Sequence, residues 1–142
     1  MVREYEPPGL RTQGIFVDAS PGARETAAQI ARIAASEAWD CIREGGRVLL
    51  WAPGTEPSQS SFDLWAQLEW LARYPEGERD AWGWIPSIGD EVVFVTAGGD
   101  QQVIDAVQVA RSRGAHVRGW VVGDANLDVD AEVQRAGLEW PL

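Results

Sequence analysis

The sequence predicts an α/β protein with a three-layer, open, doubly wound sheet of about five parallel strands. Residues 47–52, 91–96 and 116–122 form short runs that are apolar through their middles, which is typical of strands covered on both faces. Segments with helical periodicity lie between these runs. Strands that alternate with helices favour a parallel sheet closed by right-handed crossovers.

The N-terminal segment, residues 1–19, contains Pro7, Pro8 and two glycines and has no helical period. We therefore expect an N-terminal arm that lies on the surface or on a partner, pinned by the apolar patch at 14–17. A chain of 142 residues and 15.6 kDa leaves no room for a second core. The rest of the chain, 20–142, is therefore predicted to form a single domain.

The first helix is predicted from Ser20 to Gly45. Ser20 is a good N-cap and Pro21 suits the first turn, while Gly45 and Gly46 end the helix. Its apolar face is formed by Ala27, Ile30, Ala31, Ala34, Ala38, Cys41 and Ile42. A central strand is expected next, at 47–52, and Pro53 with Gly54 stops it in a turn.

A second helix is expected over 58–74, where apolar residues return at mixed helical spacing. Residues 75–79 read as a polar loop. Residues 81–86 are expected to form a short strand, which Gly83 and Pro86 keep near a sheet edge.

The second half repeats the pattern. The strand at 91–96 is followed by a helix that Asp100 caps and Gly114 closes. The strand at 116–122 comes next. A brief helix is expected at 129–136 and a terminal strand at 138–140.

Composition excludes several function classes. The net charge of −10 repels phosphate backbones and anionic lipid, so we expect neither nucleic acid nor membrane as partner. No apolar run reaches the roughly 18 residues that cross a bilayer, and no basic-then-apolar leader begins the chain, so we expect a cytoplasmic protein. Single cysteine and histidine residues, Cys41 and His116, predict no disulfide, no metal site and no cofactor.

Ligands of open parallel sheets bind beyond the carboxyl ends of the strands. This rule selects the loops at 52–61 and 96–102, whose glycines, hydroxyls and helix N-termini suit a polar ligand. The candidate ligand-binding residues are Gly54, Thr55, Ser58, Ser60, Thr96, Gly98, Gly99 and Asp100. The alternative is that the glycines only permit tight turns between strands and helices.

Two segments resemble the sugar isomerase (SIS) domain, the family that includes phosphoheptose isomerase. GDEVVFVTAGGDQQVIDAVQVARSRGAHVRGWVVG is similar to the family's strand, phosphate loop, helix and next strand, and EGGRVLLWAPGTEPSQSSFDLWAQLEW is similar in layout to its first strand, loop and helix. The resemblance covers roughly residues 22–125. It implies a SIS-like sheet with flavodoxin-like strand order, a sugar phosphate ligand and a homodimer paired along the helices that flank the sheet.

The sequence departs from the family pattern at the phosphate loop. Val95-Thr-Ala-Gly-Gly-Asp100 stands where members carry several serines, and the Asp100 carboxylate repels a dianion. Isomerase members use a glutamate on the following helix, and Glu69 lies within about one residue of that place. The alternative for Glu69 is a solvated helix residue. The usual second acid–base group is a histidine, but His116 begins a strand at the opposite end of the sheet.

These observations predict a divergent, non-catalytic SIS-like protein that binds a sugar-phosphate-like or other small metabolite at the strand ends. One alternative is an active phosphosugar isomerase with Glu69 as catalytic acid/base. Another is an oligomerising interaction protein, because the chain holds eight tryptophans and tryptophan is enriched at interfaces. Trp51 and Trp120 are expected in the core. The helix at 58–74, with Trp65 and Trp70, is the expected dimer surface.

Overall fold

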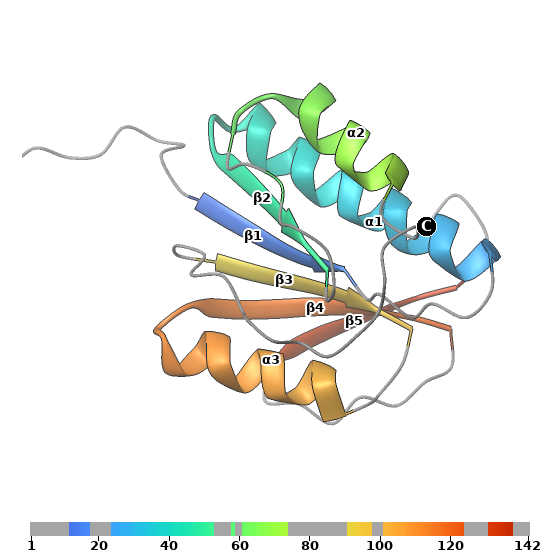
Figure 1. Ribbon diagram of the computed structural model, residues 1–142. Helices are drawn as coiled ribbons and strands as arrows, with labels where there is room; N and C mark the ends of the chain where they lie inside the picture. The colour runs from blue at the N-terminus through green and yellow to red at the C-terminus, as the bar shows by residue number, and fades with distance from the viewer. Residues whose placement is uncertain are drawn as a thin grey trace, which may run out of the picture.

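The computed structural model of the protein describes residues 12–17, 24–52, 58, 61–73, 91–97, 101–123 and 131–137. Five strands form one sheet in the order β2-β1-β3-β4-β5 (Figure 1). Every neighbouring pair is parallel. The strands are β1 (Thr12–Val17), β2 (Arg47–Trp51), β3 (Glu91–Thr96), β4 (His116–Val122) and β5 (Glu132–Ala136). The predicted open, parallel α/β sheet is confirmed.

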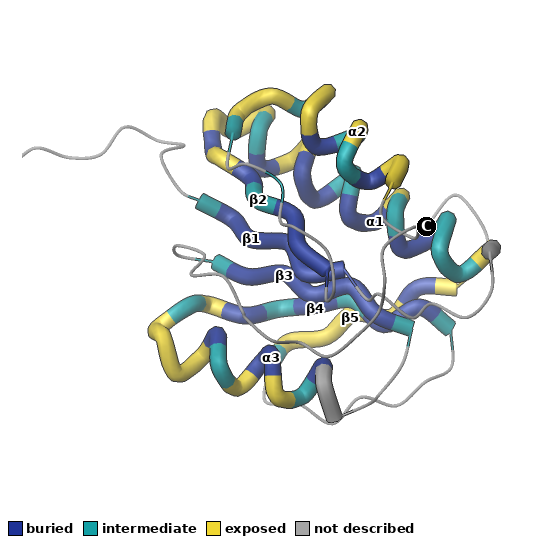
Figure 2. Tube along the Cα trace, viewed as in Figure 1, coloured by how far each residue is buried: buried dark blue, intermediate teal, exposed yellow. Residues whose placement is uncertain are grey.

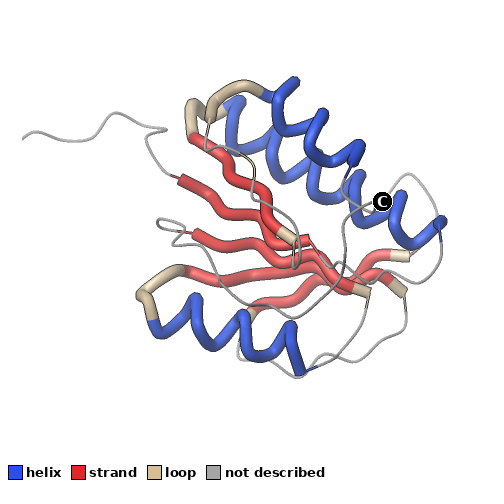
Figure 3. The backbone as a smooth tube through the Cα atoms, viewed as in Figure 1, coloured by secondary structure: helices blue, strands red, loops and turns tan. Residues whose placement is uncertain are grey.

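Three helices cover this sheet within the described residues: α1 (Arg24–Arg43), α2 (Leu64–Arg73) and α3 (Gln101–Ser112). Figures 1 and 3 show α1 and α2 on one face of the sheet and α3 on the other, which gives the predicted three layers. The predicted helix ends at Gly45 and Gly114 are confirmed. Both glycines have a positive φ, 88° and 86°, and the residue after each donates its N–H to a carbonyl in the last turn.

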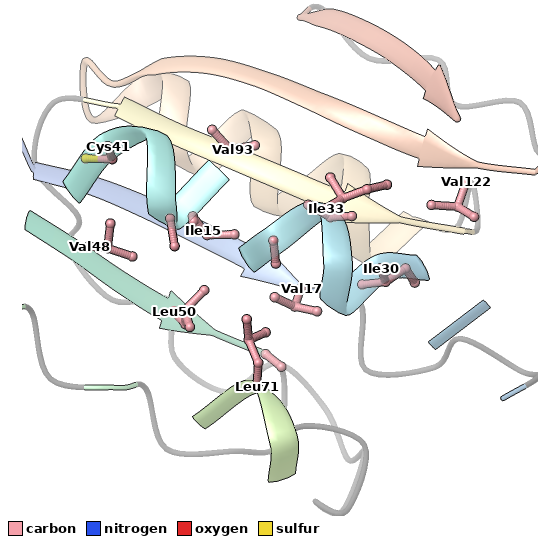
Figure 4. Packing of buried hydrophobic residues seen from close by; sticks show 14 of the residues in the cluster. Ile15, Val17, Ile30, Ile33, Cys41, Val48, Leu50, Leu71, Val93 and Val122 are labelled. Carbon is pink, nitrogen blue, oxygen red and sulfur yellow. The ribbon is translucent and has the colours of Figure 1, made fainter. Parts of the chain in front are cut away.

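Each face of the sheet has its own apolar cluster, because successive strand residues point to opposite faces. Beneath α1 and α2, Ile15, Val93 and Leu50 pack with Ile30 and other buried side chains (Figure 4). Beneath α3, a second cluster is formed by Phe16, Trp51, Val92, Phe94, Val103, Val107, Ala110 and Val117. The expectation that Trp51 lies in the core is confirmed, whereas Trp120 is only partly buried and packs against the first cluster.

The expectation of a surface arm over residues 1–19 is wrong for Thr12–Val17. This segment is β1, which lies inside the sheet between β2 and β3 and is buried from Gln13 to Val17. Its apolar run spans only Ile15 to Val17, which is too short to predict a strand. Hydrogen bonding to β2 on one side and to β3 on the other makes this segment a strand.

The brief helix expected at 129–136 is also wrong, because Glu132–Ala136 is the edge strand β5. Only Ala136 in this strand is buried, so its side chains carry no alternation of apolar and polar residues. Val129, Val133 and Ala136 have helical spacing, but hydrogen bonding to β4 decides the conformation. The strands expected at 81–86 and 138–140 lie outside the described residues.

The helix expected over 58–74 begins at Leu64 instead. Ser58 and Ser61 form backbone hydrogen bonds with Leu50 and Val48 of β2, which attach these two serines to the edge of the sheet before α2 begins. Asp63 then caps α2, because its Oδ1 accepts the N–H of Trp65 at 3.0 Å. No described helix is long and apolar enough to cross a membrane.

Candidate functional site

The strand order places a topological switch point between β1 and β3. The chain leaves β1 through α1 on one face and leaves β3 through α3 on the other face (Figure 1). In open α/β sheets with this order, ligands bind in the crevice outside the carboxyl ends of the two diverging strands. The carboxyl ends here are Val17 and Thr96.

Thr96 is the predicted ligand residue that the structure places at this point. It is the last residue of β3, pairs with Val121 of β4 and is fully buried. Gly54, Thr55, Ser60, Gly98, Gly99 and Asp100 lie outside the described residues.

Ser58 has a structural role at the edge of the sheet. Its Oγ accepts the N–H of Leu50 at 2.7 Å and donates to Oε1 of Gln67 at 2.7 Å. Its own N–H donates to the Leu50 carbonyl at 2.8 Å. The Ser58 hydroxyl proton is therefore already used to attach this segment to β2 and α2.

Gln67 of α2 joins this helix to β2 and to the two serines, and its role was not predicted from the sequence. Its side chain is fully buried, and its Nε2 donates to the Val48 carbonyl and to the Ser61 Oγ, both at 3.1 Å. The signal was present, because Gln67 falls on the face that Leu64 and Leu71 define in α2. A polar residue at a core position of an amphipathic helix predicts a buried hydrogen-bonded group.

Glu69, the predicted catalytic acid/base, lies on the solvent side of α2. It forms an ion pair with Arg73 at 2.9 Å, and both side chains are mostly exposed. Glu69 and Ser58 line the same shallow pocket, of about 580 Å³, together with Trp70 and other residues. Thr96 does not line this pocket, since β1 separates β3 from β2 and neighbouring strands lie about 4.8 Å apart. The structure thus brings Glu69 to Ser58 but not to Thr96.

His116 lies at the amino ends of the strands, opposite to the carboxyl ends where Thr96 lies, as was predicted from the sequence. It begins β4 and pairs with Glu91, the first residue of β3, whereas Thr96 ends that strand. His116 is exposed and borders a second pocket, of about 610 Å³, near Arg111 and Glu132. Thr96 and His116 therefore do not face a common substrate.

A partly buried polar cluster ties α1 to the sheet on the face that α1 covers. Arg118 of β4 donates two hydrogen bonds to the Glu37 carboxylate of α1, at 2.7 and 2.6 Å. Nε1 of Trp120 donates to the same carboxylate at 2.9 Å, and Gln13 of β1 donates to Glu91 at 2.7 Å. The hydrogen bonds from Arg118 to Glu37 raise the pKa of Arg118 above its ordinary value, against the opposing effect of burial.

Nearly all buried side-chain nitrogen and oxygen atoms of this cluster form hydrogen bonds. Gln13 Oε1 is the one buried side-chain oxygen or nitrogen in the described segments without a hydrogen-bond partner. Gln13 and Glu91 are at the amino ends of their strands, away from the carboxyl edge where Thr96 lies. The cluster therefore positions α1 and is not part of the candidate ligand site.

No group of three or more His, Cys, Asp or Glu side chains in the described ranges is arranged to hold a metal ion. Cys41 is buried, and its Sγ lies 3.6 Å from the Arg47 carbonyl. A thiol enclosed among apolar side chains is chemically inert compared with an exposed thiolate.

Comparisons with protein-family models and with curated proteins find no match to this chain. The resemblance to the SIS domain therefore stays a prediction from the sequence.

Proposed function

We propose that this domain binds a small polar metabolite, without turnover, at the carboxyl ends of β1 and β3. The observation that carries the proposal is the all-parallel order β2-β1-β3-β4-β5. In this order the switch point lies between β1 and β3, and such folds bind ligands at the carboxyl ends of the strands there. Thr96 is the described hydroxyl at that point. A sugar phosphate is the ligand class that the SIS resemblance implies.

The charges of the segments that follow the strands argue against a bare phosphate as the ligand. Segments 18–23, 53–57, 98–100 and 124–130 follow the carboxyl ends of β1 to β4 and contain no arginine or lysine. Their acidic residues are Asp18, Glu56, Asp100, Asp124, Asp128 and Asp130. Carboxylates repel a bare phosphate dianion, so the proposed ligand is a neutral sugar or a sugar phosphate that arrives with Mg²⁺.

Two observations support binding without turnover. The Glu69 carboxylate is exposed to solvent, where it forms a weak, salt-screened surface ion pair with Arg73 and is not enclosed with a substrate. His116, the chain's single histidine, lies at the other edge of the sheet from Thr96. An aldose–ketose isomerase needs two acid–base groups on one substrate.

Ligand binding can be tested by thermal unfolding of the full chain with neutral sugars and with sugar phosphates, each with and without MgCl₂. A ligand at 100 times its Kd adds about 2.7 kcal/mol, which raises Tm by several degrees. Thr96→Val should reduce this ligand-dependent rise, because it changes the buried residue that ends β3 directly behind the proposed site. Thr12→Val is the matched control at the amino end of β1 and should retain it. Failure of every probe to raise Tm would refute the proposal.

The isomerase alternative has its own test. Wild-type protein is incubated with aldose phosphates in D₂O and followed by NMR for deuterium incorporation at the carbon next to the carbonyl. We expect none. Incorporation that Glu69→Gln abolishes would establish the isomerase and overturn binding without turnover.

The proposal includes a cytoplasmic location. It rests on Cys41, the single cysteine of the chain, which is buried and suits a reducing compartment.

A further inference from the structure

The shallow pocket beside α2, of about 580 Å³, is separate from the proposed ligand site. Six of the eight described residues that line it are polar. Its lining positions 63, 66, 67 and 70 have the spacing of one helix face. The pocket therefore lies between that face of α2 and two serines held by β2, Ser58 and Ser61.

Hydrogen bonds fix the buried part of the pocket wall. Gln67 is fully buried, and its Nε2 donates to the Val48 carbonyl and to Ser61 Oγ, both at 3.1 Å. Its Oε1 accepts the Ser58 hydroxyl proton at 2.7 Å. These bonds hold α2, β2 and the serines in one arrangement, so the pocket is formed before any ligand arrives, as most small-molecule sites are.

Other side chains of the pocket keep unused hydrogen-bonding atoms. Ser61 Oγ accepts two hydrogen bonds, each at 3.1 Å, and its own proton has no acceptor among the described residues. Asp63 caps α2 through Oδ1, which accepts the N–H groups of Trp65 and Ala66, and its Oδ2 has no donor in the same part of the chain. The pocket thus offers a donor at Ser61 and an acceptor at Asp63.

A second donor and a second acceptor come from the ion pair near the end of α2. Glu69 Oε1 accepts from Arg73 Nη2 at 2.9 Å, and both side chains are mostly exposed. Within the described ranges, this bond leaves the second carboxylate oxygen of Glu69 and the other guanidinium N–H groups of Arg73 for a ligand. The open side of the pocket therefore presents both donors and acceptors.

The charges around the pocket favour a neutral ligand. Asp63 and Glu69 are the described carboxylates that line it, and Arg73 is the described cation. Arg47 adds a second cation nearby, because its guanidinium lies 4.7 Å above the ring of Phe62, the residue before Asp63. An anion is repelled by the two carboxylates, and a cation is repelled by the two guanidinium groups.

Two indole rings supply apolar surface at this pocket. Trp70 lines it and is partly buried against the apolar cluster beneath α1 and α2. Trp65 is 78% exposed and lies one turn before Glu69. Figure 2 shows exposed residues along the outer side of α2. An indole ring is an apolar body with one N–H donor, so it packs against C–H groups of a ligand.

A sugar chain matches these three properties. Its rings are uncharged, carry hydroxyl groups that both donate and accept hydrogen bonds, and have C–H groups on their faces. A site for a small free ligand buries roughly 70–90% of it, whereas a shallow pocket suits one unit of a longer chain whose next unit packs on Trp65. We propose that this pocket binds a neutral oligosaccharide. The inference is independent of the proposed metabolite site, because Thr96 does not line the pocket and no phosphate is required.

The test is two-dimensional ¹⁵N–¹H NMR of the indole N–H signals of the full chain, assigned from tryptophan variants. The probes are maltohexaose, cellohexaose and chitohexaose, each at up to about 5 mM. We expect one of them to shift the Trp65 and Trp70 signals with a Kd of about 1 mM or lower. Its Kd should change less than about twofold between about 50 and 500 mM NaCl, because salt does not screen a neutral ligand. Trp65→Ala should raise this Kd about fivefold, and Arg73→Ala about tenfold.

Trp39→Ala is the matched control, because Trp39 is 46% exposed on α1, does not line the pocket and should leave the Kd unchanged. Circular dichroism melts verify that each variant is folded. The inference is overturned if no probe shifts the two indole signals, or if Trp65→Ala and Trp39→Ala raise the Kd equally. Tighter binding of spermidine or glucose 6-phosphate at these signals would also overturn it. The metabolite site is tested separately by Tm, so either proposal can fail alone.

Discussion

Gly119 of β4 is a position where one added methyl group would clash with a core side chain. It pairs with Phe94 of β3, and a Cβ at Gly119 would lie 2.3 Å from two atoms of the Phe94 ring. Real side chains do not approach this closely. Phe94 is 1% exposed and packs with Val103 and Val107 of α3, so the ring has no space to move into.

Gly119→Ala should therefore destabilise the protein by about 1–2 kcal/mol. Overpacking a close-packed core costs about 1–3 kcal/mol, and the lower entropy of the unfolded alanine chain offsets about 0.4–1 kcal/mol. The expected loss in Tm is roughly 3–8 °C for a chain of this length. Urea unfolding followed by circular dichroism gives the free energy of unfolding directly.

Two further variants show whether the clash is the cause. Phe94→Leu removes the ring edge, so Gly119→Ala should cost less than about 0.5 kcal/mol in that background. Gly114→Ala tests a glycine with a φ of 86° and no atoms within 4 Å of its added Cβ, so only backbone strain of about 1–2 kcal/mol applies. An equal cost of Gly119→Ala in both backgrounds would refute the steric explanation.

Three other outcomes follow from the buried polar groups. Glu37→Gln should cost about 2–3 kcal/mol, somewhat less than for a fully buried pair because Arg118 is 31% exposed, and Arg118→Met should recover part of that loss in the double variant. No recovery would show that the pair is not coupled. This cost should stay constant from pH 7 to 10, because the raised pKa of Arg118 keeps its guanidinium charged throughout that range. The stabilisation by the pair is lost only at higher pH, as pH rises through the folded-state pKa of Arg118. A cost that falls within that range would contradict the assignment. Gln67→Leu should cost about 2–3 kcal/mol, because it leaves the Val48 carbonyl and a serine hydroxyl without their partner, whereas exposed Gln134→Leu should change stability by less than about 0.5 kcal/mol. Equal costs for the two glutamine variants would remove the role given to Gln67.

The predicted elements that the structure confirms are those with strong local signals. The strands at 91–96 and 116–122 are apolar runs with matching bounds in the fold. The ends of α1 and α3 were predicted because glycines stand at 45 and 114, and glycine readily adopts the positive φ that closes a helix; both residues adopt it in the structure. These signals depend on neighbours within a few residues, so they can be read from a single sequence.

The candidate site was predicted less completely. Thr96 follows from the end of an apolar run together with the general behaviour of parallel sheets. Ser58 was selected for its hydroxyl, but Leu50 and Gln67 use that hydroxyl to hold the sheet edge. Hydrogen bonding of this kind depends on which elements become neighbours in space.

The amino-acid sequence by itself determined the layered α/β architecture, the parallel strands and the acidic character, because periodicity, glycine stops and charge are properties of short segments. Tertiary structure alone decided that Thr12–Val17 is an interior strand and that Glu132–Ala136 is an edge strand. It also decided that Glu37 meets Arg118 across 81 residues of chain. Pairing between strands and contact between distant side chains are set by the packing of the whole domain, which no local pattern records.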